Sequence, residues 1–220
     1  PAKAMVARGY AVASVGYRLS QHAIYPAQIE DCKAAIRWLR AHAQEYGIDP
    51  KRVGVWGASA GGHLVALLGT TGHLQDFDVG EHLDQPSRVQ CVIDWFGPTD
   101  FLHYGEPPWV RLDYPKSVVT KLLGGRVSED ENRARRASPV YFVKSDAAPF
   151  LIMQGDKDPL VPLQQSELLH AALQKAGVES HLEILPGAAH GGGAFNSAES
   201  LKRMADFFDK HLLHAEVAAR

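Results

Sequence analysis

One pentapeptide, Gly57-Ala58-Ser59-Ala60-Gly61, constrains the fold of this chain more than any other feature. A short apolar run rich in β-branched residues (52–56) precedes it, and an apolar run typical of a helix (62–68) follows it. Small residues beside the serine let the backbone turn sharply from a strand into a helix, which lifts the hydroxyl above the sheet edge. A Gly/Ala/Ser loop without chemistry is the alternative for the bare pattern, and the two flanks argue against it.

Strands and helices are predicted to alternate along the chain. We expect strands at 10–17, 52–56, 88–96, 148–154 and 178–185, and helices at 2–7, 26–46, 60–69, 163–176 and 194–213. This alternation is typical of an α/β fold, a mostly parallel sheet with helices on both faces. No repeat or linker interrupts it, so residues 1–220 are predicted to form a single domain. The irregular, proline-rich stretch at about 97–137 is predicted to be a lid-like insertion.

Composition excludes several classes of function. The chain has 220 residues, 45% hydrophobic, with a net charge of −2, which argues against a nucleic-acid partner. No apolar run approaches the roughly 18 residues of a membrane span. Cys32 and Cys91 are predicted to be buried thiols, with a disulfide between them as the alternative. No H-x-x-x-H or C-x-x-C pair suggests a metal, so no cofactor is predicted, and localisation stays open between the cytoplasm and secretion.

Residues that could activate the serine follow two later strands. A serine hydroxyl needs a base to take its proton, and the base needs a third group to orient it. In a parallel sheet, functional loops lie beyond the carboxyl ends of the strands. The loop after 148–154 carries Asp156 and Asp158, and the loop after 178–185 carries His190. The chain order is therefore serine, aspartate, histidine, which is the order of α/β-hydrolases.

At these residues the chain resembles the α/β-hydrolase superfamily. Within it, the chain is most similar to the small esterases related to acetyl-xylan/feruloyl esterases and to hormone-sensitive-lipase-like carboxylesterases. The resemblance covers most of residues 10–192 and is carried by YAVASVGYRLS, PAQIEDCKAAIRWLRAHAQEYGIDPKRVGVWGASAGGHLVALL, WFGPTD, APFLIMQGDKDPLVPLQQSELLHAAL and LEILPGAAHGG.

The resemblance implies a role for each matching residue. Ser59 would be the nucleophile and His190 the general acid and base. Asp158, which directly precedes the proline of DPLVP, would be the orienting carboxylate, and Asp156 is its rival, with turn formation as the other reading. The backbone N–H of Ala60, the residue after the nucleophile, would bind the oxyanion.

The expected activity is hydrolysis of short-chain acyl esters through an acyl-enzyme, with a small-molecule ester as substrate. Cleavage of amides by the same triad, as in a peptidase or arylformamidase, is one alternative. A catalytically impaired hydrolase-like protein with a role in binding or assembly is another. The ester prediction follows from the resemblance, because the motifs by themselves fix the substrate poorly.

The chain departs from the family at its start. Before the helix that corresponds to the one ending near Gly9, the family has three strands and a His-Gly-Gly stretch that supplies oxyanion N–H groups. No His-Gly-Gly stretch lies upstream of Ser59 in this sequence, and no residues here correspond to those three strands. His190-Gly191-Gly192 lies after the last strand and is assigned to the triad. Three arrangements would satisfy the sheet: an upstream part outside this sequence, direct pairing of 10–17 with 52–56, or a homodimer formed through the open sheet edge.

The remaining candidates are predicted to be mostly structural. His63 is expected to pack or support its helix, Asp94 to be a buried polar partner, and Asp100 to cap a helix. Five aromatic residues are candidates for an acyl or aryl pocket, with lid packing as the alternative: Trp95, Phe96, Phe101, Tyr104 and Trp109.

Overall fold

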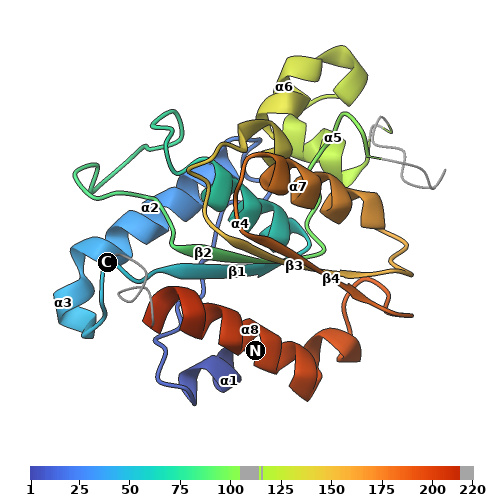
Figure 1. The fold of residues 1–220 in the computed structure, drawn as a ribbon. Coiled ribbons are helices and arrows are strands. Elements are labelled where there is room, and N and C mark those ends of the chain that lie inside the picture. Colours follow the sequence, from blue (N-terminus) through green and yellow to red (C-terminus); the bar gives the residue numbers. More distant parts are fainter. Residues whose placement is uncertain (105–113, 115, 214–220) are drawn as a thin grey trace.

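A four-stranded parallel sheet forms the centre of the protein (Figure 1). The computed structural model describes residues 1–104, 114 and 116–213. The strands are β1 (Gly54–Ala58), β2 (Cys91–Trp95), β3 (Phe150–Gly155) and β4 (Ser180–Leu185), in the order β1-β2-β3-β4. All three pairings are parallel, which confirms the predicted α/β architecture.

Helices cover both faces of the sheet, as Figure 1 shows. On one face lie α2 (Ala27–Ala41), α4 (Ala60–Thr70) and α7 (Leu163–Lys175), with the short α3 (Ala43–Tyr46) after α2. On the other lie α1 (Ala2–Val6) and α8 (Ala198–Phe208), which continues as the π-helical turn η4 (Asp209–Leu213). The crossovers from β1 to β2 and from β3 to β4 therefore run on the face of α4 and α7.

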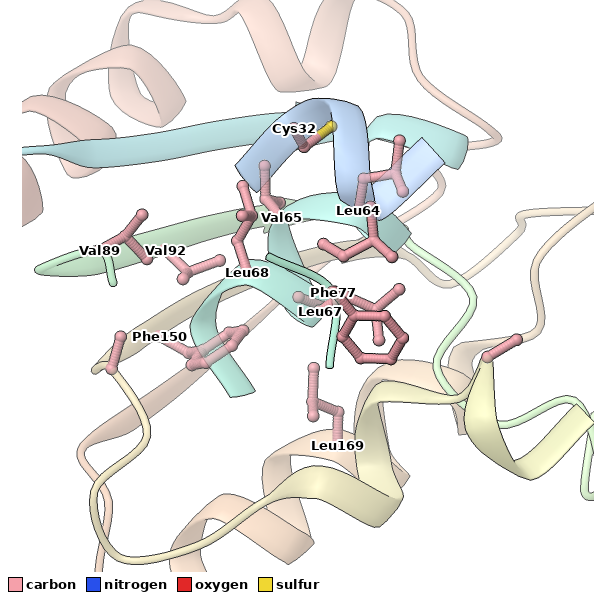
Figure 2. Packing of buried hydrophobic residues seen from close by; sticks show 14 of the residues in the cluster. Cys32, Leu64, Val65, Leu67, Leu68, Phe77, Val89, Val92, Phe150 and Leu169 are labelled. Carbon is pink, nitrogen blue, oxygen red and sulfur yellow. The ribbon is translucent and has the colours of Figure 1, made fainter. Parts of the chain in front are cut away.

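Two apolar clusters, one on each face, hold the sheet. Figure 2 shows the first, in which Leu64 and Leu68 of α4 pack with Val92 of β2 and Phe150 of β3. The second joins the opposite faces of β2 and β3 to α1 and α8; its fully buried members are Cys91, Ile93, Met153, Phe195 and Met204. Because β2 and β3 are buried on both faces, their sequences are continuously apolar apart from a few polar side chains.

The prediction of a strand at 10–17 was wrong. No strand is assigned there, residues 11–16 are exposed, and the segment runs from the face of α1 to the face of α2 (Figure 1). Direct pairing of this segment with the serine strand, one of the three arrangements considered, does not occur either, because β1 pairs only with β2 within the described chain. A β-prone segment becomes a strand only where a neighbour accepts its backbone hydrogen bonds. This segment is tied instead at its ends, by Tyr10 Oη donating to Asp209 (2.6 Å) and Arg18 pairing with Asp31 (2.8 Å).

The other predicted elements differ less from those in the structure. The helix predicted at 26–46 breaks at His42 into α2 and α3, and Gly47 ends α3 in the left-handed conformation (φ 63°). The last predicted helix begins as the 3₁₀ turn η3 (Gly193–Asn196) before α8. The stretch at about 97–137 contains α5 (Val118–Leu123), η1 (Val127–Glu129) and α6 (Glu131–Arg136), and η2 (Pro139–Phe142) follows it. Its role as a lid, and the single domain over 1–220, stay predictions.

Buried cations on α2 anchor the long loop between α4 and β2. Arg37, whose side chain is 1% exposed, pairs with Asp78 (Nη1 to Oδ1, 2.7 Å) and also donates to the backbone oxygens of Val79 and Glu81. Lys33, fully buried, donates to two further carbonyls of the same loop. Removing Arg37 or Lys33 would take a charged donor from carbonyl oxygens of this loop that are buried or partly buried, which is costly.

Cys32 and Cys91 are free, buried thiols, so the prediction of two small hydrophobic residues is confirmed and the disulfide alternative is not. Among the residues that the structure describes, no helix combines the length and apolar character required to cross a bilayer.

Candidate active site

A strained turn presents Ser59 at the end of β1. The residue has φ 56° and ψ −117°, a backbone conformation that non-glycine residues rarely adopt, and it directly precedes α4. A Cβ at Gly57 would lie 2.2 Å from the carbonyl oxygen of Gly61, so only glycine fits at that position. The Ser59 N–H donates to the carbonyl of Trp95 (2.9 Å), which ties the turn to the end of β2.

Three side chains from separate loops form one hydrogen-bonded chain. Nε2 of His190, in the loop after β4, lies 2.8 Å from Oγ of Ser59. Nδ1 of His190 lies 2.7 Å from Oδ2 of Asp158, in the loop after β3. The Asp158 side chain is fully buried and that of His190 is 18% exposed. The arrangement lets the histidine receive a proton from the hydroxyl while the carboxylate fixes the ring.

Local donors keep Asp158 ionised. Burial by itself raises the pKa of a carboxyl group, but the hydrogen bonds from His190 and from the backbone N–H groups of Val161 and Leu160 outweigh it. The pKa of Asp158 is therefore held below its ordinary value. The two N–H groups reach Oδ1 at 3.0 and 2.8 Å, while Oδ2 faces the histidine. The carboxylate is thus oriented as well as charged.

Gln154, the fifth residue of β3, is a member of the site that sequence reasoning missed. Its side-chain Nε2, fully buried, donates to Oδ2 of Asp158 (3.1 Å) and to the carbonyl of Val161 (3.2 Å). Its Oε1 accepts from Ser166 Oγ (3.0 Å), which fixes the direction of the amide. The available signal was a lone amide near the carboxyl end of an otherwise apolar strand, where a buried polar group requires partners.

The structure separates the two candidate aspartates. Asp156 is exposed, and its Oδ1 accepts from the backbone N–H of Gly187 (2.6 Å), which links two loops. That contact matches the turn-forming alternative. Of the two, it is Asp158 whose carboxylate hydrogen-bonds His190.

One of the predicted pocket aromatics contacts the triad. The ring of Phe96 lies 4.6 Å from that of His190, centroid to centroid. Trp95 packs in the core against Trp56, Phe101 packs against His63, and the Tyr104 hydroxyl donates to the Leu160 carbonyl (3.4 Å). Trp109 lies outside the described residues.

Ala60 begins α4 directly after the nucleophile. As the first helical residue, it has an N–H without an acceptor inside the helix, at the positive end of the helix dipole. Its role as an oxyanion donor stays a prediction. His190-Gly191-Gly192 lies in the loop after β4, where it supplies the histidine that contacts Ser59.

The other polar candidates have structural contacts. His63 is buried, its Nε2 donates to the Ala137 carbonyl (2.6 Å), and burial lowers its pKa to about 4 despite that hydrogen bond. The prediction that Asp100 caps a helix was wrong. Its carboxylate instead closes a turn by accepting from the N–H groups of Leu102 and His103. No group of three or more His, Cys, Asp or Glu side chains gathers as a possible metal site within the described part of the chain.

The parallel sheet, with a serine turn, an acid loop and a histidine loop beyond the ends of its strands, defines an α/β-hydrolase fold. Comparison with known sequences identifies the family within this class. The chain belongs to the BD-FAE family, whose sequence model matches residues 1–173, a region that contains Ser59 and Asp158 and ends before His190.

Named relatives and solved structures agree with the class. Esterase LipQ of Mycobacterium tuberculosis is 33% identical over 201 residues, which cover 90% of this chain and 46% of LipQ. Carboxylesterase NlhH of the same species is 46% identical over 201 residues, covering 84% of this chain and 59% of NlhH. A truncated form of a carbohydrate esterase from gut microbiota superimposes with a TM-score of 0.84 at 34% identity, covering 91% of this chain and 73% of that one. The chain thus spans only about half the length of the two sequence relatives.

Proposed function

We propose that this chain is a serine carboxylesterase that hydrolyses short-chain acyl esters. The observation that carries the proposal is the continuous hydrogen-bonded chain from Ser59 through His190 to the buried Asp158. The relatives named esterase and carboxylesterase support the same class of reaction. A small-molecule ester is the expected substrate.

The proposed reaction uses His190 first as a base and then as an acid in each half-reaction. The Ser59 oxygen attacks the ester carbonyl as its proton passes to Nε2 of His190, and the Asp158 carboxylate stabilises the resulting imidazolium. The imidazolium then protonates the departing alcohol, which leaves an acyl group on Ser59. Water gives a proton to His190 and attacks the acyl carbonyl, and collapse of this second intermediate releases the acid and restores the serine hydroxyl.

Hydrolysis by this mechanism also needs donors for the negative charge that develops on the ester oxygen. We assign one donor, the N–H of Ala60 at the start of α4. Loss of a single oxyanion donor costs on the order of 10²–10³ in rate. The chain is therefore expected to hydrolyse activated esters more readily than unactivated ones, because a better leaving group requires less stabilisation of the intermediate.

Hydrolysis of p-nitrophenyl acetate and p-nitrophenyl butyrate, measured beside Ser59→Ala, tests this function. Activity in the parent chain and its loss in a folded S59A protein is the expected result. Faster cleavage of an anilide than of the ester of the same acyl group would favour a peptidase or arylformamidase. Equal inertness of two folded proteins would reject the esterase and favour a role in binding or assembly.

We further propose that a second copy of the chain pairs with the outer edge of β1. Within the described residues this edge has no strand partner, and exposed edges favour pairing with another chain. Light scattering coupled to gel filtration should give a dimer mass; a monomer at all concentrations tested would reject the proposal.

A further inference from the structure

A buried carboxyl group that the proposed reaction does not use lies beside the serine turn. Asp94, on β2, is 0% exposed and is in register with Gly57 of β1. Its Oδ1 accepts from the backbone N–H of Gly97 (2.9 Å). Its Oδ2 is buried and has no hydrogen-bond partner among the described residues. Such a group is expensive to keep in a core, so its presence calls for a function.

Asp94 is packed between the turn after β2 and the first turn of α4. A Cβ at Gly62 would lie 2.4 Å from Oδ1 of Asp94 and 2.8 Å from Cα of Gly97. A Cβ at Gly97 would lie 2.6 Å from the same oxygen and 2.5 Å from the carbonyl carbon of Gly62. The three residues therefore leave no free space between the strand, the turn and the start of the helix, and movement of one must move the others.

The turn that Asp94 closes contacts both Ser59 and His190. The Trp95 carbonyl accepts from the Ser59 N–H (2.9 Å). Phe96, whose φ of 44° is strained for a non-glycine residue, places its ring 4.6 Å from the ring of His190. One short segment thus supports Ser59 from its backbone and His190 from its side chain.

We infer that Asp94 is a positioning residue, which fixes the turn at 95–97 and through it the distance between Ser59 and His190. The inference rests on the proposed function, since it assigns the carboxyl group to the same reaction. Misplacement of reacting groups by about 1 Å can cost on the order of 10²-fold in rate. A positioning residue acts on the geometry of the reacting groups, so the loss should fall on kcat and leave KM little changed.

Three variants test the inference. Asp94→Ala removes the acceptor for Gly97, and we expect kcat for p-nitrophenyl butyrate to fall by about tenfold to 10²-fold. Asp94→Asn keeps an acceptor of the same shape and should restore most of kcat. Val92→Ala is the matched control: Val92 lies two residues earlier on the same face of β2, is also 0% exposed, and contacts α4 at Gly69, far from the serine. It should lose stability without losing kcat.

Labelling of Ser59 by a fluorophosphonate is measured in parallel, because it reports on the nucleophile without depending on the choice of substrate. If the parent protein hydrolyses no ester but is labelled quickly, and D94A is labelled more slowly, the proposed substrate class is rejected and the positioning role of Asp94 is kept. Wild-type kcat and labelling rate in folded D94A, or equal losses in D94A and V92A, would overturn the inference. If D94A does not fold, Asp94→Leu, which keeps the branched shape but has no acceptor for Gly97, replaces it under the same criteria.

Discussion

Replacement of Asp158 by asparagine tests the triad most directly. Asparagine has the same shape, and its Oδ1 can still accept from the backbone N–H groups of Leu160 and Val161, now 2.8 and 3.0 Å away. Its amide nitrogen would then lie against Nδ1 of His190, where the carboxylate oxygen is now 2.7 Å away. Two donors cannot face each other, so the imidazole changes tautomer, and its Nε2 carries a proton when it should accept one from Ser59.

The expected loss is large because the change disables His190 as the general base while the backbone stays intact. A wrong histidine tautomer costs on the order of 10⁴ in kcat, which corresponds to about 5.5 kcal/mol of transition-state stabilisation. KM should change little. The assay is the steady-state hydrolysis of p-nitrophenyl butyrate, with circular dichroism to show that the variant is folded.

Asp156→Asn is the matched control, two residues away in the same loop. Asparagine can still accept the hydrogen bond that Asp156 receives from Gly187, so kcat should stay close to that of the parent. Near-parental activity of D158N, or an equal loss in D156N, would refute the assignment of the acid.

Three other comparisons test the packing, the buried ions and the pH dependence of stability. Gly57→Ala should prevent stable folding, because its Cβ would lie 2.2 Å from the Gly61 carbonyl oxygen, whereas Gly61→Ala, with nothing within 4 Å, should keep or raise Tm; similar Tm values would contradict this. Arg37→Met should lower the free energy of unfolding in urea by about 1–3 kcal/mol, because it takes a charged donor from two loop carbonyls and leaves Asp78 the longer contact with Lys33 (3.6 Å). The exposed control, Arg203→Met, should cost less than about 1 kcal/mol, and an equal cost for both would refute the argument. Burial raises the pKa of Asp94 from 3.8 to about 7, so the folded state binds more protons than the unfolded state between these values, and stability should fall as pH rises through them. The fall amounts to at most about 4 kcal/mol and should be absent from D94N; parallel urea stabilities of the two proteins from about pH 4 to about pH 8 would contradict it.

The serine turn and the order of its partners could be predicted because their signals are local. Gly57 and Gly61 mark a sharp turn, and apolar runs on both sides mark a strand and a helix. Asp158 and His190 follow the third and fourth strands of the sheet, and parallel strands bring the loops at their carboxyl ends to one edge. Periodicity and glycine placement act over a few residues, so the sequence carries them without reference to the rest of the fold.

The prediction at 10–17 failed for the opposite reason. The segment has the composition of a strand, but composition only makes a residue suitable for a sheet and does not supply a neighbour. Whether its backbone groups find partners depends on what lies beside β1, and among the described residues nothing pairs there. The break of the long helix at His42 is a smaller case of the same limit, since the exact end of a helix depends on its contacts.

The sequence by itself determined the α/β class, the serine turn and the loops that hold an acid and a histidine. The family resemblance favoured Asp158 over Asp156, but only the tertiary structure shows that Asp158 meets His190, that Gln154 donates to its carboxylate, and that Asp94 hydrogen-bonds the turn at Gly97. Hydrogen bonds act over about 3 Å, and residues such as Ser59 and His190, 131 positions apart, come within that distance only when the whole sheet has formed.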